Sequence, residues 1–126
     1  MRTGFVRLAA VAFMPLLAAC PQNPLEDTVC TMEARSAVSV EMRDARTGAA
    51  LTGPATLTVR DGAFVETVEI PAEFSTMGVA HERAGVYVVT VRKAGYRDWT
   101  RADVAVKRDE CHVQTVVLRA ALEPAS

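Results

Sequence analysis

Short runs of alternating apolar and polar residues, separated by turn signals, fill the chain from residue 34 onward. The most strand-like run is Val86–Arg92, where β-branched residues occupy both faces, as is typical of a central strand. No segment of this region keeps apolar residues at i, i+3 and i+4 for three turns, which an amphipathic helix requires. The pattern therefore predicts an all-β domain with almost no helix outside the N-terminus.

A second clear strand signal lies near the start of this region. Ala34–Asp44 places Val38, Val40 and Met42 on one face and polar residues on the other. Turn signals divide the rest of the chain, the clearest being Asp61-Gly62, which predicts a two-residue hairpin. The other predicted strands are Thr56–Arg60, Phe64–Ile70, about Thr100–Lys107 and about Glu110–Ala120.

Two segments give a weaker signal. Pro71–Met77 is expected to be irregular. Two sets of residues compete for the inward face of the last strand: Val113, Thr115 and Val117 against Val116 and Leu118. Taken together, the elements predict a single antiparallel Greek-key β-sandwich of about seven strands.

The N-terminus has the regions of a secretory signal. Arg2 and Arg7 form a positive segment, and Leu8–Leu17 supplies an apolar run of about ten residues, too short to cross a bilayer. The run ends in Leu17-Ala18-Ala19-Cys20, which resembles the lipobox of bacterial lipoproteins. The resemblance implies cleavage before Cys20, a diacylglycerol on its sulfur and, usually, an acyl chain on its amine. An ordinary secretory signal is the alternative, because Leu-Ala-Ala also fits a signal peptidase site.

This resemblance sets the predicted domain organisation. Residues 1–19 form the signal peptide, 20–29 the lipidated cysteine and an extended tether, 30–122 the β-sandwich, and 123–126 a C-terminal tail. Two or three acyl chains, at about 0.8 kcal/mol per buried CH₂, anchor a protein firmly to membrane lipid. Pro21 stands where an aspartate favours inner-membrane retention of enteric lipoproteins. The expected location is therefore the bacterial cell envelope, at the outer membrane rather than the inner one.

The remaining two cysteines predict a disulfide. Once Cys20 is assigned to lipid, Cys30 and Cys111 form the only pair, and the envelope is an oxidising compartment. A bridge over so long a loop stabilises by roughly 4 to 5 kcal/mol on the chain-entropy model. A redox pair usually has Cys-X-X-Cys spacing, which is missing here. His112 follows Cys111, but neighbours on a strand point to opposite faces, which disfavours a shared metal.

Composition and motifs give little support to catalysis or nucleic-acid binding. The 14 Lys and Arg residues face 15 Asp and Glu residues, for a net charge of -1, so no electrostatic footprint for nucleic acid exists. His81 and His112 are the only histidines, and they are expected to be surface imidazoles, exposed or hydrogen-bonded. Glu82 and Glu110 lie near them in sequence, but any sandwich surface offers carboxylates this close to a histidine. No calcium loop, phosphate loop or nucleophile elbow occurs, so no metal, cofactor or catalytic residue is predicted.

One segment is a candidate binding patch. Cations and aromatic residues alternate across a predicted hairpin bend, in a set we call the aromatic–arginine patch: Arg92, Lys93, Tyr96, Arg97, Trp99 and Arg101. Aromatic faces stack on sugars, and arginine binds carboxylates and phosphates, so an envelope glycan, a lipid headgroup or an acidic partner fits this set. The alternative is structural: Tyr96 and Trp99 cap the core while the cations keep an edge strand soluble.

The order of elements resembles the carboxypeptidase regulatory-like domains, which are small sandwiches of prealbumin topology. The matching residues are Val38-x-Val40 before Asp44-x-x-Thr47-Gly48-x-x-Leu51, the strand Thr56–Arg60 with Asp61-Gly62, and Gly85-x-Tyr87-x-Val89-x-Val91-x-x-x-Gly95-Tyr96. The similarity covers about Ala34–Leu122. It implies a folding, docking or ligand-presenting module. The catalytic relative of this topology, 5-hydroxyisourate hydrolase, ends in Tyr-Arg-Gly-Ser, a motif that the C-terminus here lacks.

Two classes of function follow from these features. The first is a lipid-anchored, non-enzymatic β-sandwich that acts as an interaction or accessory module with an envelope protein as its partner. The second is a module that binds a glycan or another small envelope ligand through the aromatic–arginine patch. A protein interface depends on a broad apolar area, whereas a glycan site depends on Trp99 or Tyr96.

Overall fold

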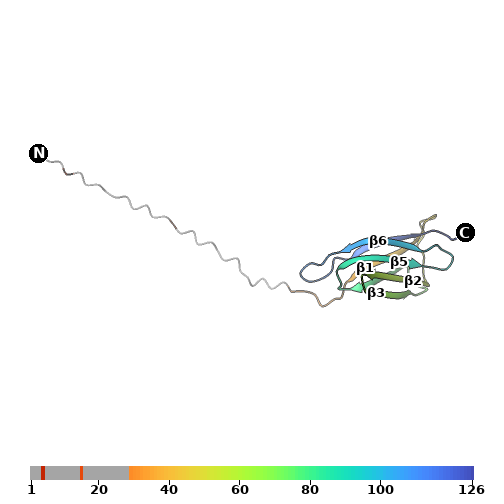
Figure 1. Cartoon of the computed structure of the whole chain (residues 1–126), viewed down its shortest axis with the longest axis horizontal. Helices are drawn as coiled ribbons and strands as arrows, with labels where there is room; N and C mark the ends of the chain where they lie inside the picture. Colours follow the sequence, from red (N-terminus) through yellow and green to blue (C-terminus); the bar gives the residue numbers. More distant parts are fainter. Residues whose placement is uncertain (1–3, 5–14, 16–28) are drawn as a thin grey trace.

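The computed structural model describes Gly4, Pro15 and residues 29–126, and the last of these ranges forms a two-layer β-sandwich (Figure 1). Its strands are β1 (Ser36–Asp44), β2 (Ala55–Asp61), β3 (Phe64–Ile70), β4 (Thr76–His81), β5 (Gly85–Arg92), β6 (Trp99–Val106) and β7 (Val116–Leu122). The described residues contain no helix, and thus none long and apolar enough to cross a membrane. The predicted all-β sandwich is confirmed. The predicted signal peptide, Cys20 and most of the tether lie outside the described residues.

The strands form a three-stranded sheet, β4-β1-β7, and a four-stranded sheet, β3-β2-β5-β6. All neighbouring strands are antiparallel except β1 and β7, which run parallel. The sequence had predicted a sandwich of antiparallel strands. The structure is antiparallel at every other pair of neighbours and departs from this prediction only at β1 and β7. The parallel pair arises because the chain leaves β6 and crosses to the other sheet, where β7 joins the edge of β1 in the same direction.

The core lies between the sheets and is built from the inward half of each strand. Val38, Val40 and Met42 of β1 are fully buried, as their alternation predicted. On β5 the buried residues are Tyr87, Val89 and Val91, while Val86 and Val88 face solvent. The strand β5 has β2 on one side and β6 on the other, which confirms its predicted central position.

Residues 71–75 are irregular, as predicted, but Thr76 and Met77 belong to β4, a strand that the sequence did not predict. Val79 and Ala80 are both buried, and Ala80 has a positive φ of 55°. This left-handed residue interrupts the alternation of inward and outward side chains, so the sequence of the segment lacks the apolar/polar alternation that would predict a strand. Gly78 lies opposite Ser39 in the pairing with β1 and contributes no side chain to either face.

The last strand begins later than the sequence predicted. Residues 110–115 form a loop, and β7 starts at Val116 and continues to Leu122. Leu118, Ala120 and Leu122 point into the core, whereas Val117 is 68% exposed, so the inward face is the one that holds Leu118. Val113 is also buried, but from within the loop.

The hairpin between β2 and β3 is shifted by one residue from the prediction. Asp61 pairs with Phe64 as the last rung, so the two-residue loop is Gly62-Ala63, with Gly62 at a φ of 58°. Asp61 is free to bind Arg83, whose Nη1 lies 2.9 Å from the Asp61 Oδ2. The Arg83 guanidinium also lies over the Phe64 ring, 4.0 Å from its centroid.

The sandwich has two distinct ends. The N-terminal end holds residues 29–35 and the loop 107–115, and the C-terminal end holds the loops 44–48 and 93–98 with residues 123–126. At the C-terminal end Arg97 N donates to Glu123 O at 2.8 Å, and Ala125 N donates to Gly95 O at 2.9 Å. Figure 1 shows the C-terminus at the end of the sandwich away from the entry of the described chain. Residues 123–126, predicted as a tail, therefore pair with the loop 93–98.

Candidate functional site

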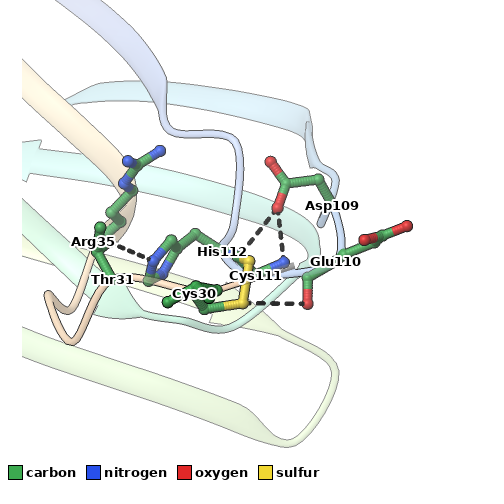
Figure 2. Close-up of a pocket in the computed structure, with 8 residues that line it drawn as sticks. Cys30, Thr31, Arg35, Asp109, Glu110, Cys111 and His112 are labelled. Atoms are coloured by element: carbon green, nitrogen blue, oxygen red, sulfur yellow. Dashed lines mark hydrogen bonds between the residues drawn. A yellow bond between two sulfur atoms is a disulfide. The ribbon is translucent and has the colours of Figure 1, made fainter. Parts of the chain in front are cut away.

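An open pocket at the N-terminal end has a volume of about 510 Å³ (Figure 2). Its walls come from two segments that are distant in sequence, residues 29–35 and residues 109–112. Figure 2 shows the Cys30–Cys111 disulfide between these segments, with Asp109 and His112 beside it. The pocket thus lies where the chain enters the domain.

The disulfide joins Cys30 to Cys111, as the cysteine count predicted. The two Cα atoms are 5.1 Å apart, and the cysteines are separated by 81 positions in the sequence. Cys30 precedes β1 and Cys111 precedes β7, which are the two parallel neighbours of the three-stranded sheet. The bridge therefore crosslinks the chain at the start of both strands.

Asp109 shapes the loop that carries Cys111 and His112. Its Oδ1 accepts hydrogen bonds from the backbone N–H groups of Cys111 and His112, both at 2.9 Å. An aspartate that bonds its own backbone two and three residues on forms an Asx-type turn. These bonds, the one from His112 first, lower the pKa of Asp109 because they favour the carboxylate. The turn holds Cys111 in position for the bridge.

His112 is buried and fully engaged. Only 9% of its side chain is exposed. Its Nδ1 lies 2.5 Å from Glu82 Oε1, and its Nε2 lies 2.9 Å from Thr31 Oγ1. The carboxylate at Nδ1 fixes the ring so that Nδ1–H donates to Glu82 and Nε2 faces the Thr31 hydroxyl. The sequence predicted a surface imidazole, exposed or hydrogen-bonded; His112 is hydrogen-bonded, but it is buried rather than at the surface.

Glu82 is the centre of this cluster. Its φ of 54° turns the chain between β4 and β5 and aims the carboxylate at the N-terminal segment. Oε1 accepts from Arg35 N at 2.9 Å, Oε2 accepts from Val113 N at 3.2 Å, and Arg108 Nη1 lies 3.6 Å from Oε2. The pKa of Glu82 falls to about 2, chiefly through the bond from Arg35 N and then through His112 and Val113, although partial burial opposes this. One carboxylate thus joins three segments of the chain.

Acid should weaken the domain through Glu82. Its pKa is about 2 in the folded protein against an ordinary 4.5, so the fold favours the carboxylate. The resulting stabilisation is complete above the ordinary value and is lost as the pH falls from about 4.5 through about 2. Glu82→Gln should remove this part of the pH dependence and lower stability at neutral pH.

The measurement is the free energy of urea unfolding between pH 6 and pH 2 for the wild type and Glu82→Gln. Glu73→Gln is the matched control, because Glu73 is exposed and has no hydrogen bond or ion pair among the described residues. It should follow the wild-type curve. A Glu82→Gln curve parallel to the wild type over this range would contradict the assignment.

The remaining histidine lies apart from this cluster. His81 is exposed, and its Nε2 lies 3.3 Å from Ser36 Oγ. Across the part of the chain that the structure describes, no group of three His, Cys, Asp or Glu side chains is placed to hold a metal ion. Instead, the hydrogen bonds from His112 to Thr31 and to Glu82 connect the N-terminal segment to the body of the domain.

Sequence reasoning did not pair His112 with Glu82. The two residues lie 30 positions apart on different loops, and Glu82 was noted only as a neighbour of His81. Only the assembled sheets bring the start of β5 next to the loop before β7. The residues next to His112 and Glu82 in the sequence do not indicate that these two side chains will meet.

The aromatic–arginine patch lies at the C-terminal end, opposite the pocket. Five of its members belong to the loop 93–98 or to the strand ends beside it, and Arg101 lies further along β6. Arg92 Nε lies 3.3 Å from Asp98 Oδ2, and Lys93 Nζ donates to Pro54 O at 3.4 Å. Arg97 is exposed and forms no ion pair among residues 29–126. The structure therefore gathers the predicted residues at one end.

The two aromatic side chains of the patch are half-buried. Tyr96 and Trp99 both pack against the core. The Tyr96 hydroxyl donates to Asp44 Oδ2 at 3.1 Å, and burial followed by this bond raises the pKa of Tyr96. The Arg101 guanidinium lies over the Trp99 ring, 5.3 Å from its centroid. Part of each ring is thus used to close the core, as the structural alternative proposed.

No protein-family model matches this chain, and the comparison with curated proteins finds no match.

Proposed function

We propose that the protein is a lipid-anchored, non-enzymatic β-sandwich of the bacterial envelope that acts as an interaction or accessory module. The observation that supports this most is the separation of its two ends. The disulfide, Glu82 and His112 fasten the N-terminal segment at one end, and the loops 44–48 and 93–98 lie with residues 123–126 at the other. A tether that enters at the first end leaves the second end accessible to a partner.

The C-terminal end has the features of a recognition surface on a rigid scaffold. Asp44 Oδ1 accepts from Arg46 N at 2.8 Å and from Thr47 N at 3.0 Å, which fixes the loop 44–48. Residues 123–126 and the loop 93–98 brace each other through backbone bonds. Loops held by a rigid sandwich are common positions for binding residues. The carboxypeptidase regulatory-like assignment is part of this proposal, because the residues that carry the resemblance form two of these turns.

The glycan-binding alternative has narrower support. Arg101 over Trp99 offers a cation beside an aromatic ring at the surface. Both aromatic residues of the patch also pack against the core, which reduces the ring area left for stacking on a sugar. The outer membrane remains the proposed location, with membrane lipid bound through acyl chains on Cys20.

The lipid anchor is tested by Cys20→Ser in the full-length chain. We expect the wild type to sediment with membranes, to gain the mass of its acyl groups and to be released only by detergent. Cys20→Ser removes the sulfur that takes the lipid, so it should appear in the soluble fraction with unmodified mass. Wild-type protein in the soluble fraction without added mass would contradict lipidation and leave the interaction module to be tested separately.

The interaction module is tested by crosslinking the lipidated protein in its own envelope and identifying what is captured. We expect one envelope protein at a yield near that of the bait. Arg97→Glu with Arg101→Glu should reduce its capture, since both cations are exposed at the C-terminal end. Arg119→Glu, exposed on the other sheet, is the matched control. Recovery of peptidoglycan or other glycan with no reproducible protein would instead favour the alternative.

A further inference from the structure

The two most exposed of the large apolar side chains that the structure describes belong to one short segment. Val29 has an exposed fraction of 88% and Met32 one of 102%, whereas the other exposed large apolar side chains reach 68% at most. Both lie in residues 29–35, at the end where the chain enters the domain (Figure 1). Water thus surrounds two side chains whose removal from water is favourable.

The fold holds Met32 in this exposed position. The chain bends at Met32, and the disulfide lies two residues before the bend. Thr31 Oγ1 lies 2.9 Å from Nε2 of the buried His112. On the far side of the bend, Arg35 N donates to Glu82 Oε1 at 2.9 Å. Because the segment is fastened on both sides, the outward position of Met32 is part of the fold.

The charges around this segment are balanced. The exposed charged residues of the segment 29–35 and the loop 107–115 are three cations and three anions: Arg35, Lys107, Arg108, Glu33, Asp109 and Glu110. A surface that docks on anionic lipid through its charge carries an excess of cations. Balanced charges beside exposed apolar side chains suit a layer of zwitterionic headgroups over an apolar interior instead.

The length of chain before this segment limits how far this end can lie from the lipid. With Cys20 as the anchor, eight residues, 21–28, separate it from Val29. Fully extended, this stretch spans at most about 30 Å, and the headgroup layer takes up about 5 to 8 Å of that distance. The N-terminal end is therefore within about 25 Å of the membrane surface. A contact made over so short a tether is intramolecular, so weak apolar insertion is enough to hold it.

We propose that the N-terminal end of the domain lies on the phospholipid surface that holds the anchor, with Met32 and Val29 inserted at the level of the headgroups. The proposal rests on the lipid anchor proposed above and adds the orientation of the domain. The sandwich stands on this end, so the aromatic–arginine patch points away from the membrane. Because the charges are balanced, the contact is insensitive to salt and needs no anionic lipid.

The two lysines of the chain report this orientation without any substitution. Lys107 follows β6 at the N-terminal end, and Lys93 follows β5 at the C-terminal end. Lys107 is exposed and forms no ion pair among the described residues. The lipidated full-length protein, in vesicles of phosphatidylethanolamine and phosphatidylcholine, is labelled with a sulfonated succinimidyl ester that stays in water. The Cys20→Ser chain in solution gives the reference ratio of Lys107 labelling to Lys93 labelling.

The ratio should fall on the vesicles. An end that lies on the membrane for about three quarters of the time lowers the ratio about fourfold. Val29→Glu with Met32→Glu should raise it to the value in solution, because this variant keeps the anchor and loses the inserted side chains. Val117→Glu, at an exposed position of the three-stranded sheet, is the matched control and should keep the low ratio. Circular dichroism and the intact mass of the disulfide-bonded chain confirm that each variant is folded.

The outcomes separate the orientation from the anchor. A wild type without acyl mass would overturn the anchor, and the orientation with it. Acyl mass with equal ratios on vesicles and in solution would overturn the orientation alone. A low ratio that Val29→Glu with Met32→Glu does not raise would also overturn it, because the tether alone would then exclude the reagent. A low ratio in the native membrane but not on the vesicles would place a protein at this end instead of lipid.

Discussion

Replacing Cys30 and Cys111 together by serine is expected to lower the free energy of unfolding by about 4.5 kcal/mol on the chain-entropy model. The reason is the length of the loop, since the cysteines are separated by 81 positions and the bridge greatly restricts the unfolded chain. For a domain of this size such a loss lowers the melting temperature by about 20 °C or more. Calorimetry and urea unfolding of the double variant measure both quantities.

The matched control for this prediction lies in the same loop. Gln114→Ser replaces an exposed side chain close to Cys111 and should change stability by no more than about 0.5 kcal/mol. The wild type unfolded with a reductant present should behave as the double serine variant does. A loss below about 1 kcal/mol would mean that the unfolded chain already holds residues 30 and 111 close together, against the model.

Tyr87→Ala is expected to destabilise the domain by about 3 to 5 kcal/mol, the usual cost of deleting a large buried ring. Tyr87 is fully buried on β5, and its ring meets the edge of Phe64 at a centroid distance of 6.3 Å. Its hydroxyl donates to the Arg83 backbone oxygen at 2.5 Å, four residues upstream, which resembles the tyrosine corner of other sandwiches. The alanine variant loses both the packing and this bond.

Two further variants separate these contributions in urea unfolding. Tyr87→Phe keeps the ring and leaves the Arg83 oxygen without its donor, so it should cost about 1 to 3 kcal/mol. Val86→Ala changes the adjacent residue, which points to solvent, and should cost no more than about 0.5 kcal/mol. If Tyr87→Phe were as damaging as Tyr87→Ala, the hydroxyl rather than the ring would hold β5 in place.

The strands could be predicted where one face is buried and the other is exposed. β1 shows this alternation clearly in its sequence. β5 was recognised from its run of β-branched residues instead, although it too lies inside a sheet with solvent on its outer face. β4 was missed because Ala80, at a positive φ, leaves two consecutive residues buried. The start of β7 was placed too early because Val113 is buried from within a loop, where it looks like part of a strand pattern.

The candidate site could be predicted only where covalent chemistry or neighbouring residues carried the signal. The Cys30–Cys111 disulfide could be predicted because only two cysteines remain after Cys20 is assigned to lipid, and because the expected compartment is oxidising. The aromatic–arginine patch could be predicted because its residues lie close together in the sequence. The bond between His112 and Glu82 depends on two loops that meet only after both sheets have formed. The hydroxyl of Tyr96 likewise finds its hydrogen-bond partner, Asp44, at the end of β1, 52 positions away in the sequence. Such tertiary partners leave no trace in local periodicity.

The parallel pairing of β1 with β7, closed by the disulfide, has a mechanical consequence. A pull on the N-terminal segment reaches Cys30 first, and the bridge divides the tension between the starts of two neighbouring strands. Neither strand can slide past the other, so the load passes from β1 across its ladder with β4, whose hydrogen bonds are sheared together rather than opened one by one. A domain held at this end and pulled at its other end should therefore resist extension.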